Sequence, residues 1–271
     1  VWVLRAILLV AGWRKAMNSF HCHESDCRPV NSGTVVIPTR NEEQRIGLLL
    51  DDLLQQTSLP DQIVVADDHS TDDTKGVVLS KRDHAGVVAL VGLTEGTGKK
   101  KAIETGIHLA GTPLIVTTDA DSRAGKRWIE SIHCHFSDES VKMLVGAVRI
   151  QQDDLFSSLQ AMEFASLIGS AAATLALGFP TMCNGANLAF RKTAFEQAGG
   201  YAGNLHLASG DDEFLLRKIA DKYQNGIKFN ADPESVVETS PQRTFVDFFN
   251  QRIRWASKWN HHQKPGSAFL A

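Results

Sequence analysis

Two aspartates one residue apart, Asp119 and Asp121, follow a run of strand-forming residues from Leu114 to Thr118. The chain leaves the sheet at the end of a strand, so both carboxylates can turn toward one point in a cleft. Two carboxylates suit a hard divalent cation that keeps some waters and takes its other ligands from a substrate phosphate. The alternative is that Asp-x-Asp opens a turn, with Ser122 capping a helix. The triplet alone does not decide between these two interpretations.

The residues around this triplet predict alternating strands and helices. Expected strands cover residues 34–38, 62–66, 86–91 and 114–118, and expected helices cover 46–54 and 102–110. This alternation predicts an α/β fold, with a mostly parallel sheet and helices on both of its faces. Right-handed crossovers place the ends of successive strands at one edge of the sheet. Asp68, Lys99 and Asp121 can therefore meet although they are far apart in the sequence.

The second half of the chain continues with shorter predicted elements and one long apolar stretch. Expected strands cover 143–150, 184–191, 227–230 and 235–238, and expected helices cover 192–198, 214–222 and 244–261. The apolar stretch 155–178 contains the uncharged run 164–183, so it must be weighed as a membrane span. A span there would put Asp121 and Asp212 on opposite sides of a membrane. We therefore expect a buried or interfacial helix.

Composition excludes some classes of protein. The formal net charge of −3 over 271 residues argues against a nucleic-acid binder, which usually carries a basic excess. Four cysteines without an even ladder of spacings favour reduced thiols and a cytosolic compartment. The cluster His21-Cys22-His23 with Cys27 lacks a second ligand pair at zinc-finger spacing, so we expect a solvated linker there.

The first twelve residues, VWVLRAILLVAG, are apolar apart from Arg5 and are followed by Trp13, Arg14 and Lys15. The apolar run is shorter than the ~20 residues that cross a bilayer. One interpretation is the remainder of a membrane helix, with these three residues at its cytoplasmic interface. The other is an amphipathic helix packed on the domain. A signal peptide is disfavoured because the positive charges follow the apolar run.

Seven stretches, in this order, resemble the family 2 glycosyltransferases of the GT-A fold. They are VVIPTRNEE (35–43), VVADDHSTDDT (64–74), GTGKKKAIETGI (96–107), TTDADS (117–122), CNGANLAFRKTAF (183–195), SGDDEFLL (209–216) and QRIRW (251–255). Together they cover nearly the whole chain, from about residue 34 to 259. The last, a Gln-x-x-Arg-Trp motif, resembles the membrane-associated branch that includes cellulose, chitin and hyaluronan synthases.

The resemblance implies transfer of a sugar from a nucleotide-diphosphate donor, with a UDP-sugar expected and Mg²⁺ or Mn²⁺ as the metal. A divalent cation neutralises the charge that develops on the leaving diphosphate. Asp121 is the expected direct metal ligand, together with Asp119. The expected nucleotide-sugar site comprises Pro38, Thr39, Asn41, Glu42, Asp67, Asp68, Lys99, Asp119, Ala120, Asn187, Gln251, Arg254 and Trp255. Lys100 and Lys101 are expected to be a solvated charged run.

The resemblance also places a general base at the start of a helix. Asp212 takes this role by position, and Asp211 stands where the family usually has Glu, which leaves open which carboxylate acts. The alternative is a helix start capped by Ser209, with acidic residues in its first turn. His206 lies just before this pair and can line an acceptor site. One base without a placed nucleophile agrees with the family's inverting, single-displacement mechanism.

Gln251, Arg254 and Trp255 lie at i, i+3 and i+4, hence on one helix face. Arg254 can bind the diphosphate and Trp255 can stack on an acceptor sugar. The alternative is that Trp255 and Trp259 are core or membrane-interface aromatics.

The sequence thus predicts a membrane-associated inverting glycosyltransferase whose catalytic domain faces the cytoplasm and whose acceptor is a lipid or a glycan. Expected segments are an anchor or amphipathic helix (1–17), a linker (18–33), a GT-A domain (34–262) and a tail (263–271). Within the domain, 34–122 is the expected nucleotide-binding half and 123–262 the acceptor-binding half. Single transfer is favoured over processive synthesis.

The sequence disfavours two other classes of protein. A nucleotidyltransferase is disfavoured because residues 38–43 are not Gly-rich. A non-catalytic binding module is disfavoured because the metal and base carboxylates are both present.

Overall fold

The computed structural model describes residues 2–18, 32–82, 86–203 and 211–256 of the 271-residue chain. The strands are β1 (Gly33–Thr39), β2 (Gln62–Asp67), β3 (Val88–Gly92), β4 (Leu114–Thr117), β5 (Arg123–Ala124), β6 (Met143–Gly146), β7 (Val148–Ile150), β8 (Leu188–Arg191), β9 (Ile227–Asn230) and β10 (Val237–Thr239). The helices are α1 (Trp2–Asn18), α2 (Ile46–Leu54), α3 (Thr74–Arg82), α4 (Lys99–Leu109), α5 (Trp128–Phe136), α6 (Leu155–Ala176), α7 (Lys192–Gln197), α8 (Asp211–Lys222) and α9 (Phe245–Ala256). Two short 3₁₀ turns are η1 (Gly185–Asn187) and η2 (Pro233–Ser235).

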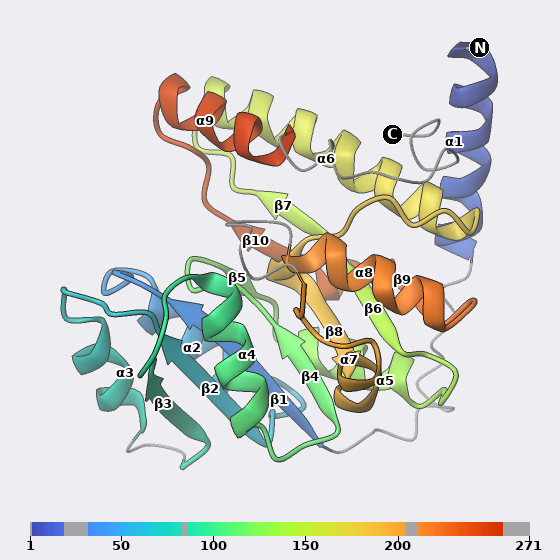
Figure 1. The fold of residues 1–271 in the computed structure, drawn as a ribbon. Coiled ribbons are helices and arrows are strands. Elements are labelled where there is room, and N and C mark those ends of the chain that lie inside the picture. The colour runs from blue at the N-terminus through green and yellow to red at the C-terminus, as the bar shows by residue number, and fades with distance from the viewer. Residues whose placement is uncertain (1, 19–31, 83–85, 204–210, 257–271) are drawn as a thin grey trace.

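A seven-stranded sheet of order β3-β2-β1-β4-β8-β6-β9 forms the centre of the molecule (Figure 1). The strands from β1 to β4 pair in parallel, whereas β8 runs antiparallel to both of its neighbours. β6 pairs in parallel with β9. The predicted α/β fold with a mixed, mostly parallel sheet is confirmed.

Alternation along β1 explains why helices cover both faces of the sheet. Val35 and Ile37 pack in one apolar core with residues of α2, α3 and α5, and Val36 packs in another with residues of α4, α7 and α8. Successive side chains of a strand point to opposite faces, so an uninterrupted apolar run fits a sheet that is buried on both sides. α4 comes so close to β1 that a Cβ on Gly106 would lie 2.4 Å from a methyl carbon of Val36.

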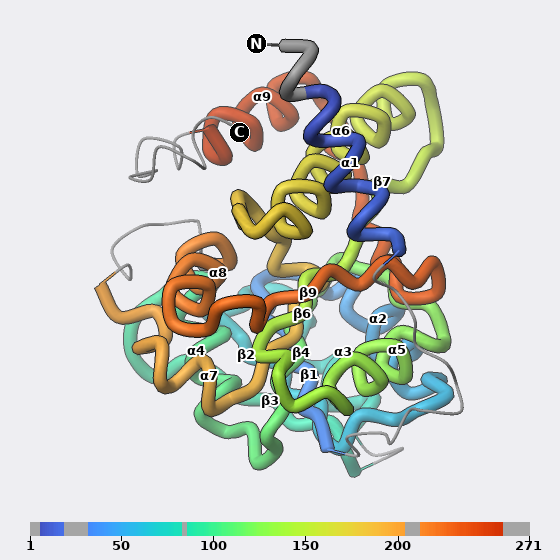
Figure 2. Tube along the Cα trace, turned by 90° about the vertical axis from the view of Figure 1, so that its right-hand side faces the viewer, coloured from blue at the N-terminus to red at the C-terminus, as the bar shows by residue number. Residues whose placement is uncertain are grey.

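A second, three-stranded sheet of order β5-β10-β7 joins the main body to a group of three helices. Figures 1 and 2 both place α1, α6 and α9 together at one end of the molecule, beyond the central sheet. α1 packs on α6, and a Cβ on Gly12 would lie 2.4 Å from the carbonyl oxygen of Ala173. The apolar N-terminus thus forms a helix that packs on α6.

Among the described helices, α6 is the one whose length and apolar composition would allow a membrane crossing. It packs against α1, β7 and β9, and 44% of its apolar stretch is buried inside the protein. A core helix has the same composition, so the expected buried or interfacial helix fits what is seen.

Three local predictions differ from the structure. The expected strand 143–150 is divided at Ala147, because β6 joins the large sheet and β7 joins the small one. α5 and β5 were not predicted. Reduced thiols were expected, but Cys134 is disulfide-bonded, whereas Cys183 is free and buried. The cluster of His21, Cys22, His23 and Cys27 lies outside the described residues.

Candidate donor and metal site

A cavity of about 450 Å³ lies where β1, β2 and β4 end and α4 begins. It is lined by Pro38, Thr39, Arg40, Glu42, Asp68, Lys99, Ala102, Asp119, Ala120, Asp121 and Arg254. Nine of these eleven residues were predicted for the nucleotide-sugar and metal site. The parallel strands bring Asp68, Lys99 and Asp121 to one edge of the sheet, as the crossover argument predicted.

The two carboxylates of the Asp-x-Asp triplet line this cavity together with cations. The Lys99 Nζ lies 2.6 Å from Oδ1 of Asp119. The Arg45 guanidinium lies 3.8 Å from Oδ2 of Asp121, which also accepts a 3.4 Å hydrogen bond from the Thr239 hydroxyl. Burial raises the pKa of Asp121, and the nearby charge of Asp119 raises it further. Burying two carboxylates this close is unfavourable unless cations compensate.

These residues fit a divalent cation that is shared with a substrate. Among the described residues no group of three or more His, Cys, Asp and Glu could enclose a metal by itself. Two carboxylates at the open end of a strand instead suit a hard cation whose remaining ligands are water and a diphosphate. The hydroxyl oxygens of Thr118 and Ser122 beside the triplet are buried without a hydrogen-bond partner in the described chain. Ser122 caps no helix, since its N–H closes a turn onto the Asp119 carbonyl at 3.1 Å.

Asp68 forms the opposite wall of the cavity. Its carboxylate accepts a 2.8 Å hydrogen bond from the Gly98 N–H and lies 3.5 Å from the Arg40 guanidinium. Burial opposes ionisation, but the His69 ring, the Gly98 N–H and the Arg40 charge together lower the pKa of Asp68. Asp68 thus ties the Gly-rich loop before α4 to the end of β2, and this holds Lys99 at the cavity.

Three residues predicted for this site hold its loops in place. Asp67 is buried, accepts the Ser70 N–H at 3.3 Å and lies 3.3 Å from Lys75, while its Oδ1 has no partner in the described chain. Asn41 adopts a left-handed backbone conformation with φ of 56° and accepts the Thr71 N–H at 2.8 Å. The Glu42 side chain lines the cavity, and the Glu42 N–H donates to the Thr74 hydroxyl at 2.8 Å. Burial raises the pKa of Glu42, with further contributions from Asp121 and Asp119.

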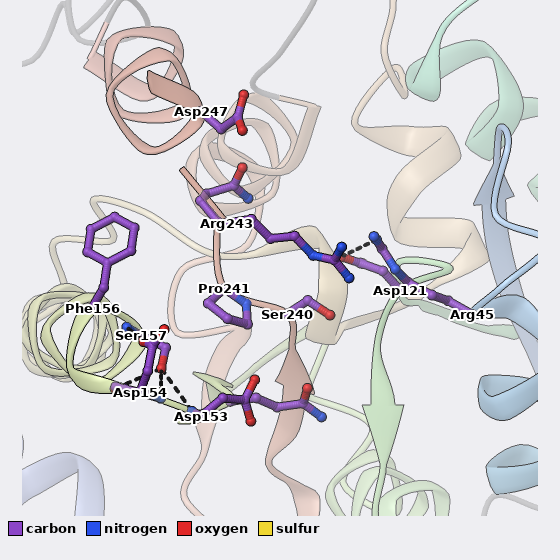
Figure 3. Close-up of a pocket in the computed structure, with 12 residues that line it drawn as sticks. Arg45, Asp121, Asp153, Asp154, Phe156, Ser157, Ser240, Pro241, Arg243 and Asp247 are labelled. Atoms are coloured by element: carbon purple, nitrogen blue, oxygen red, sulfur yellow. Dashed lines mark hydrogen bonds and ion pairs between the residues drawn. The ribbon is translucent and has the colours of Figure 1, made fainter. Parts of the chain in front are cut away.

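A second cavity of about 550 Å³ adjoins the first at Asp121 (Figure 3). It lies between the first turns of α6 and α9, and its lining includes Asp153, Asp154, Phe156, Ser240, Arg243 and Asp247. In Figure 3 the side chains of Arg45 and Arg243 reach toward Asp121 from opposite sides. A molecule in the second cavity would therefore meet the contents of the first at the Asp-x-Asp triplet.

The candidate base Asp212 is linked to the triplet through one glycine. The Asp212 Oδ2 accepts the Gly185 N–H at 3.1 Å, and the Gly185 carbonyl accepts the Thr117 hydroxyl at 2.8 Å. Thr117 ends β4, directly before the triplet. The Asp212 Oδ1 also accepts the N–H of Glu213 in the first turn of α8, where acidic residues were expected in either interpretation. The expected cap Ser209 lies outside the described residues. The Asp211 side chain and His206 lie outside what the structure describes.

Asn187 has a structural position that differs from the sugar-pocket role expected of it. The side-chain NH₂ donates to the carbonyls of Ala147 and Ser235, each at 2.8 Å, and Oδ1 accepts the Trp128 indole N–H at 3.0 Å. The residue is buried and lines neither cavity. These hydrogen bonds tie α5, η2 and the β6–β7 junction together.

Trp255 and Gln251 lie on α9 but line neither cavity, whereas Arg254 lines the first. The Trp255 ring packs on Phe164 at a centroid distance of 5.7 Å, and the Arg252 guanidinium lies 4.3 Å from its ring. This packing agrees with the core-aromatic interpretation of Trp255. Trp259 lies outside the described residues.

Lys100 departs from the expected solvated run, because its side chain is buried over the Phe214 ring of α8 at 5.5 Å. Sequence reasoning also missed the cations Arg40, Arg45 and Arg243. Arg40 and Arg45 flank the acidic pair Glu42-Glu43 in the loop after β1. This pattern of charges could have predicted that the two arginines lie at the site. Arg243 lies in the connection between β10 and α9 and reaches toward Asp121 only in the folded chain, and no local sequence pattern predicts this approach.

Residues 34–199 match the family model described as Glycosyl transferase family 2. The chain belongs to glycosyl transferase family 2. It is therefore an enzyme that transfers a sugar, and its sheet is the GT-A scaffold of this family. Over 90 residues it is 43% identical to 4,4'-diaponeurosporenoate glycosyltransferase of Staphylococcus aureus, which covers 32% of this chain and 23% of that protein. The chain thus spans about a quarter of the length of this curated relative.

The fold of this chain is similar to those of solved GT-A enzymes. Mannosyltransferase PcManGT from Pyrobaculum calidifontis, in complex with GDP-Man and Mn²⁺, has a TM-score of 0.68 at 22% identity, covering 96% of this chain and 74% of its own. S. aureus TarS in complex with UDP-GlcNAc has a TM-score of 0.59 at 17% identity, covering 79% of this chain and 59% of its own. Identity this low shows a common fold and leaves donor and acceptor to be argued from the site.

Proposed function

We propose that this family 2 glycosyltransferase moves a sugar from a UDP-sugar to a hydroxyl of a lipid or glycan acceptor, with inversion and with a divalent metal. The observation that carries the proposal is the cavity that collects Asp119, Asp121, Lys99 and Arg254 at the carboxyl ends of the strands. Two carboxylates beside two cations suit a metal-bound diphosphate, whose charge both kinds of group must balance.

The residues of the first cavity divide the binding of the donor. Asp121 and Asp119 would hold Mg²⁺ or Mn²⁺, which when bound neutralises the charge developing on the leaving diphosphate. Lys99 and Arg254 bind diphosphate oxygens as positively charged donors, Lys99 as a point charge and Arg254 as a planar fork. Asp67 and Asp68, at the end of β2, accept hydrogen bonds from the base and ribose. The donors of the two solved neighbours, GDP-Man and UDP-GlcNAc, have this diphosphate in common.

Asp212 is the proposed general base, and the second cavity is the proposed acceptor site. A carboxylate within reach of the attacking hydroxyl takes its proton as the new glycosidic bond forms and the nucleoside diphosphate leaves. This single displacement inverts the configuration of the sugar carbon. The second cavity meets the first at Asp121, so an acceptor placed there lies next to the donor. We further propose that the enzyme is membrane-associated, with this domain in the cytoplasm.

Calorimetric titration of UDP with and without Mn²⁺, on the chain and on Asp121→Asn, tests the donor site. We expect binding that requires Mn²⁺ and that the variant loses. Asp221→Asn, a carboxylate of α8 that lines neither cavity, is the control and should bind UDP as the parent chain does. Parallel titrations with GDP and dTDP show which nucleobase the donor site prefers. Failure of all three nucleotides to bind with metal would overturn the proposed donor site.

A further inference from the structure

Seven large apolar side chains of α6 and α9 are exposed at the end of the molecule that carries these helices. They are Leu155, Leu159 and Met162 on α6 and Phe245, Val246, Phe249 and Ile253 on α9, each between 51% and 77% exposed. We call these seven side chains the apolar ridge. Single exposed apolar residues are ordinary, but a contiguous group of large ones marks an interaction surface.

The ridge is contiguous because α6 and α9 run side by side in the same direction. Phe156 stacks on Phe245 with ring centroids 4.3 Å apart, and further along the pair Phe164 packs on Trp255 at 5.7 Å. With about 100° per residue, the ridge side chains of α9 fall within an arc of roughly 100° and those of α6 within roughly 60°. On parallel helices that touch through these aromatic pairs, both arcs face the same side.

One side of α9 already packs against α6. The exposed ridge side chains of α9 are therefore not explained by the contact between the two helices. Phe248 and Trp255 contact residues of α6, and Arg252 pairs with Glu163. Arg254, which lines the first cavity, lies about 80° or more around the helix from the ridge side chains. One face of α9 therefore serves the site while another carries exposed Phe, Val and Ile.

The neighbouring helix α1 indicates which partner covers the ridge. α1 packs on α6 and exposes Ile7, Val10 and Trp13, with the exposed cations Arg14 and Lys15 directly after them. α1 contains no Asp or Glu. Apolar side chains followed by Trp and two cations match a lipid surface, where aromatic rings lie at the head groups and cations meet anionic lipids.

We propose that the apolar ridge docks α6 and α9 on a lipid bilayer that contains anionic lipids. The second cavity lies between the first turns of these same helices, where Leu155, Phe245 and Val246 project. Docking therefore brings the mouth of this cavity to the membrane surface, where the head group of a lipid can enter it while its tail stays in the bilayer. The docking stands on the ridge alone, whereas the identity of this lipid as the acceptor rests on the proposed function.

Vesicle co-sedimentation of the full chain tests the docking. The probes are phosphatidylcholine vesicles with and without phosphatidylglycerol, and the ridge variant is Phe245→Ser/Phe249→Ser/Ile253→Ser. The matched control is Leu59→Ser/Leu79→Ser/Leu109→Ser, which removes three exposed apolar side chains from the nucleotide-binding half. We expect the parent chain and the control to bind the anionic vesicles equally, and the ridge variant to bind at least tenfold more weakly.

Two further measurements make each outcome decisive. Circular dichroism and Mn²⁺-dependent UDP binding, unchanged in the ridge variant, show that it is folded and that its donor site is intact. Light scattering shows whether the parent chain is a dimer and whether the ridge variant is a monomer. A parent dimer that does not bind vesicles would mean that the ridge is a contact between two copies, and this result would overturn the proposal. Equal vesicle binding by the ridge variant, or none by the parent chain, would also overturn it. If the parent chain binds vesicles but not UDP, the docking proposal is supported and the proposed donor site is refuted.

Discussion

The Nζ of Lys99 lies 2.6 Å from Oδ1 of Asp119, which joins the first residue of α4 to the Asp-x-Asp triplet after β4. The two residues are 20 positions apart, and they meet because Lys99 follows β3 and Asp119 follows β4, two strands whose carboxyl ends lie at the same edge of the parallel part of the sheet. The ion pair places a cation beside the proposed metal ligands before any donor binds. It therefore compensates the charge of the close carboxylates, and the same ammonium group can contact a diphosphate.

Replacing Lys99 by Met should weaken UDP binding roughly 10- to 100-fold at saturating Mn²⁺. A hydrogen bond to a charged group contributes about 1.5–3 kcal/mol, which corresponds to this range. Calorimetric titration measures the change. Lys101→Met, which removes a neighbouring cation that pairs with Glu104, should leave the affinity within about twofold. Equal losses in both variants would point to overall charge and not to a contact of Lys99.

Asp212→Asn should lower kcat by roughly 10²- to 10⁴-fold while UDP binding stays unchanged, since a general base acts on the acceptor and not on the nucleotide. The N–H groups of Gly185 and Glu213 donate to different oxygens of Asp212, so the amide keeps one of these two hydrogen bonds. Circular dichroism should therefore confirm that the variant is folded. Initial rates of sugar transfer and UDP titrations give the two values. Asp211→Asn is the matched variant, and a larger loss there would assign the base to Asp211.

Asn187→Leu should destabilise the fold by about 3 kcal/mol, because the Trp128 N–H and the Ser235 carbonyl lose their Asn187 hydrogen bonds and the Ala147 carbonyl keeps only the one from the Val237 N–H. Urea unfolding measures the free energy. Asn184→Ala removes a single cap of η1 and should cost about 1 kcal/mol. A leucine variant as stable as the parent but unable to bind a UDP-sugar would return Asn187 to the sugar pocket.

Two histidines of α5 should make stability depend on pH. Burial lowers the pKa of His133 and of His135, against opposing contributions from Asp61 and Asn230 respectively. The unfolded chain, with pKa values near ~6.5, then binds more protons than the folded chain just below that value. This contribution to stability is complete above ~6.5 and is lost as pH falls toward the folded pKa values.

Urea unfolding between about pH 7.5 and pH 5 tests this, because His133→Gln/His135→Gln should show a shallower loss of stability with falling pH than the parent chain. His108→Gln, at an exposed position of α4, should keep the parent slope. An unchanged slope in the double variant would mean that other groups set the acid sensitivity.

The sequence by itself determined the α/β fold and most of the donor cavity. Apolar runs that end in Asp or Pro-Thr indicate buried strands with polar residues at their carboxyl ends, and this pattern predicted Asp68, Asp119 and Asp121. Lys99 was predicted from the resemblance of its Gly- and Lys-rich loop to the family. These features are local, because strand formation depends on side-chain alternation and on the residues at which a strand stops.

The tertiary structure decided which predicted residues face a cavity and which face the core. Asn187 and Arg254 both lie in predicted motifs, yet only Arg254 lines the site. Spacing gives a residue its face on a helix or strand, but the partner of that face is set by segments far away in the sequence. Only the packing of α9 on α6 placed Trp255 against Phe164 and left the apolar ridge exposed, because no local pattern encodes a contact between residues 91 positions apart. The approach of Arg243 to Asp121 joins residues that are still farther apart in the sequence.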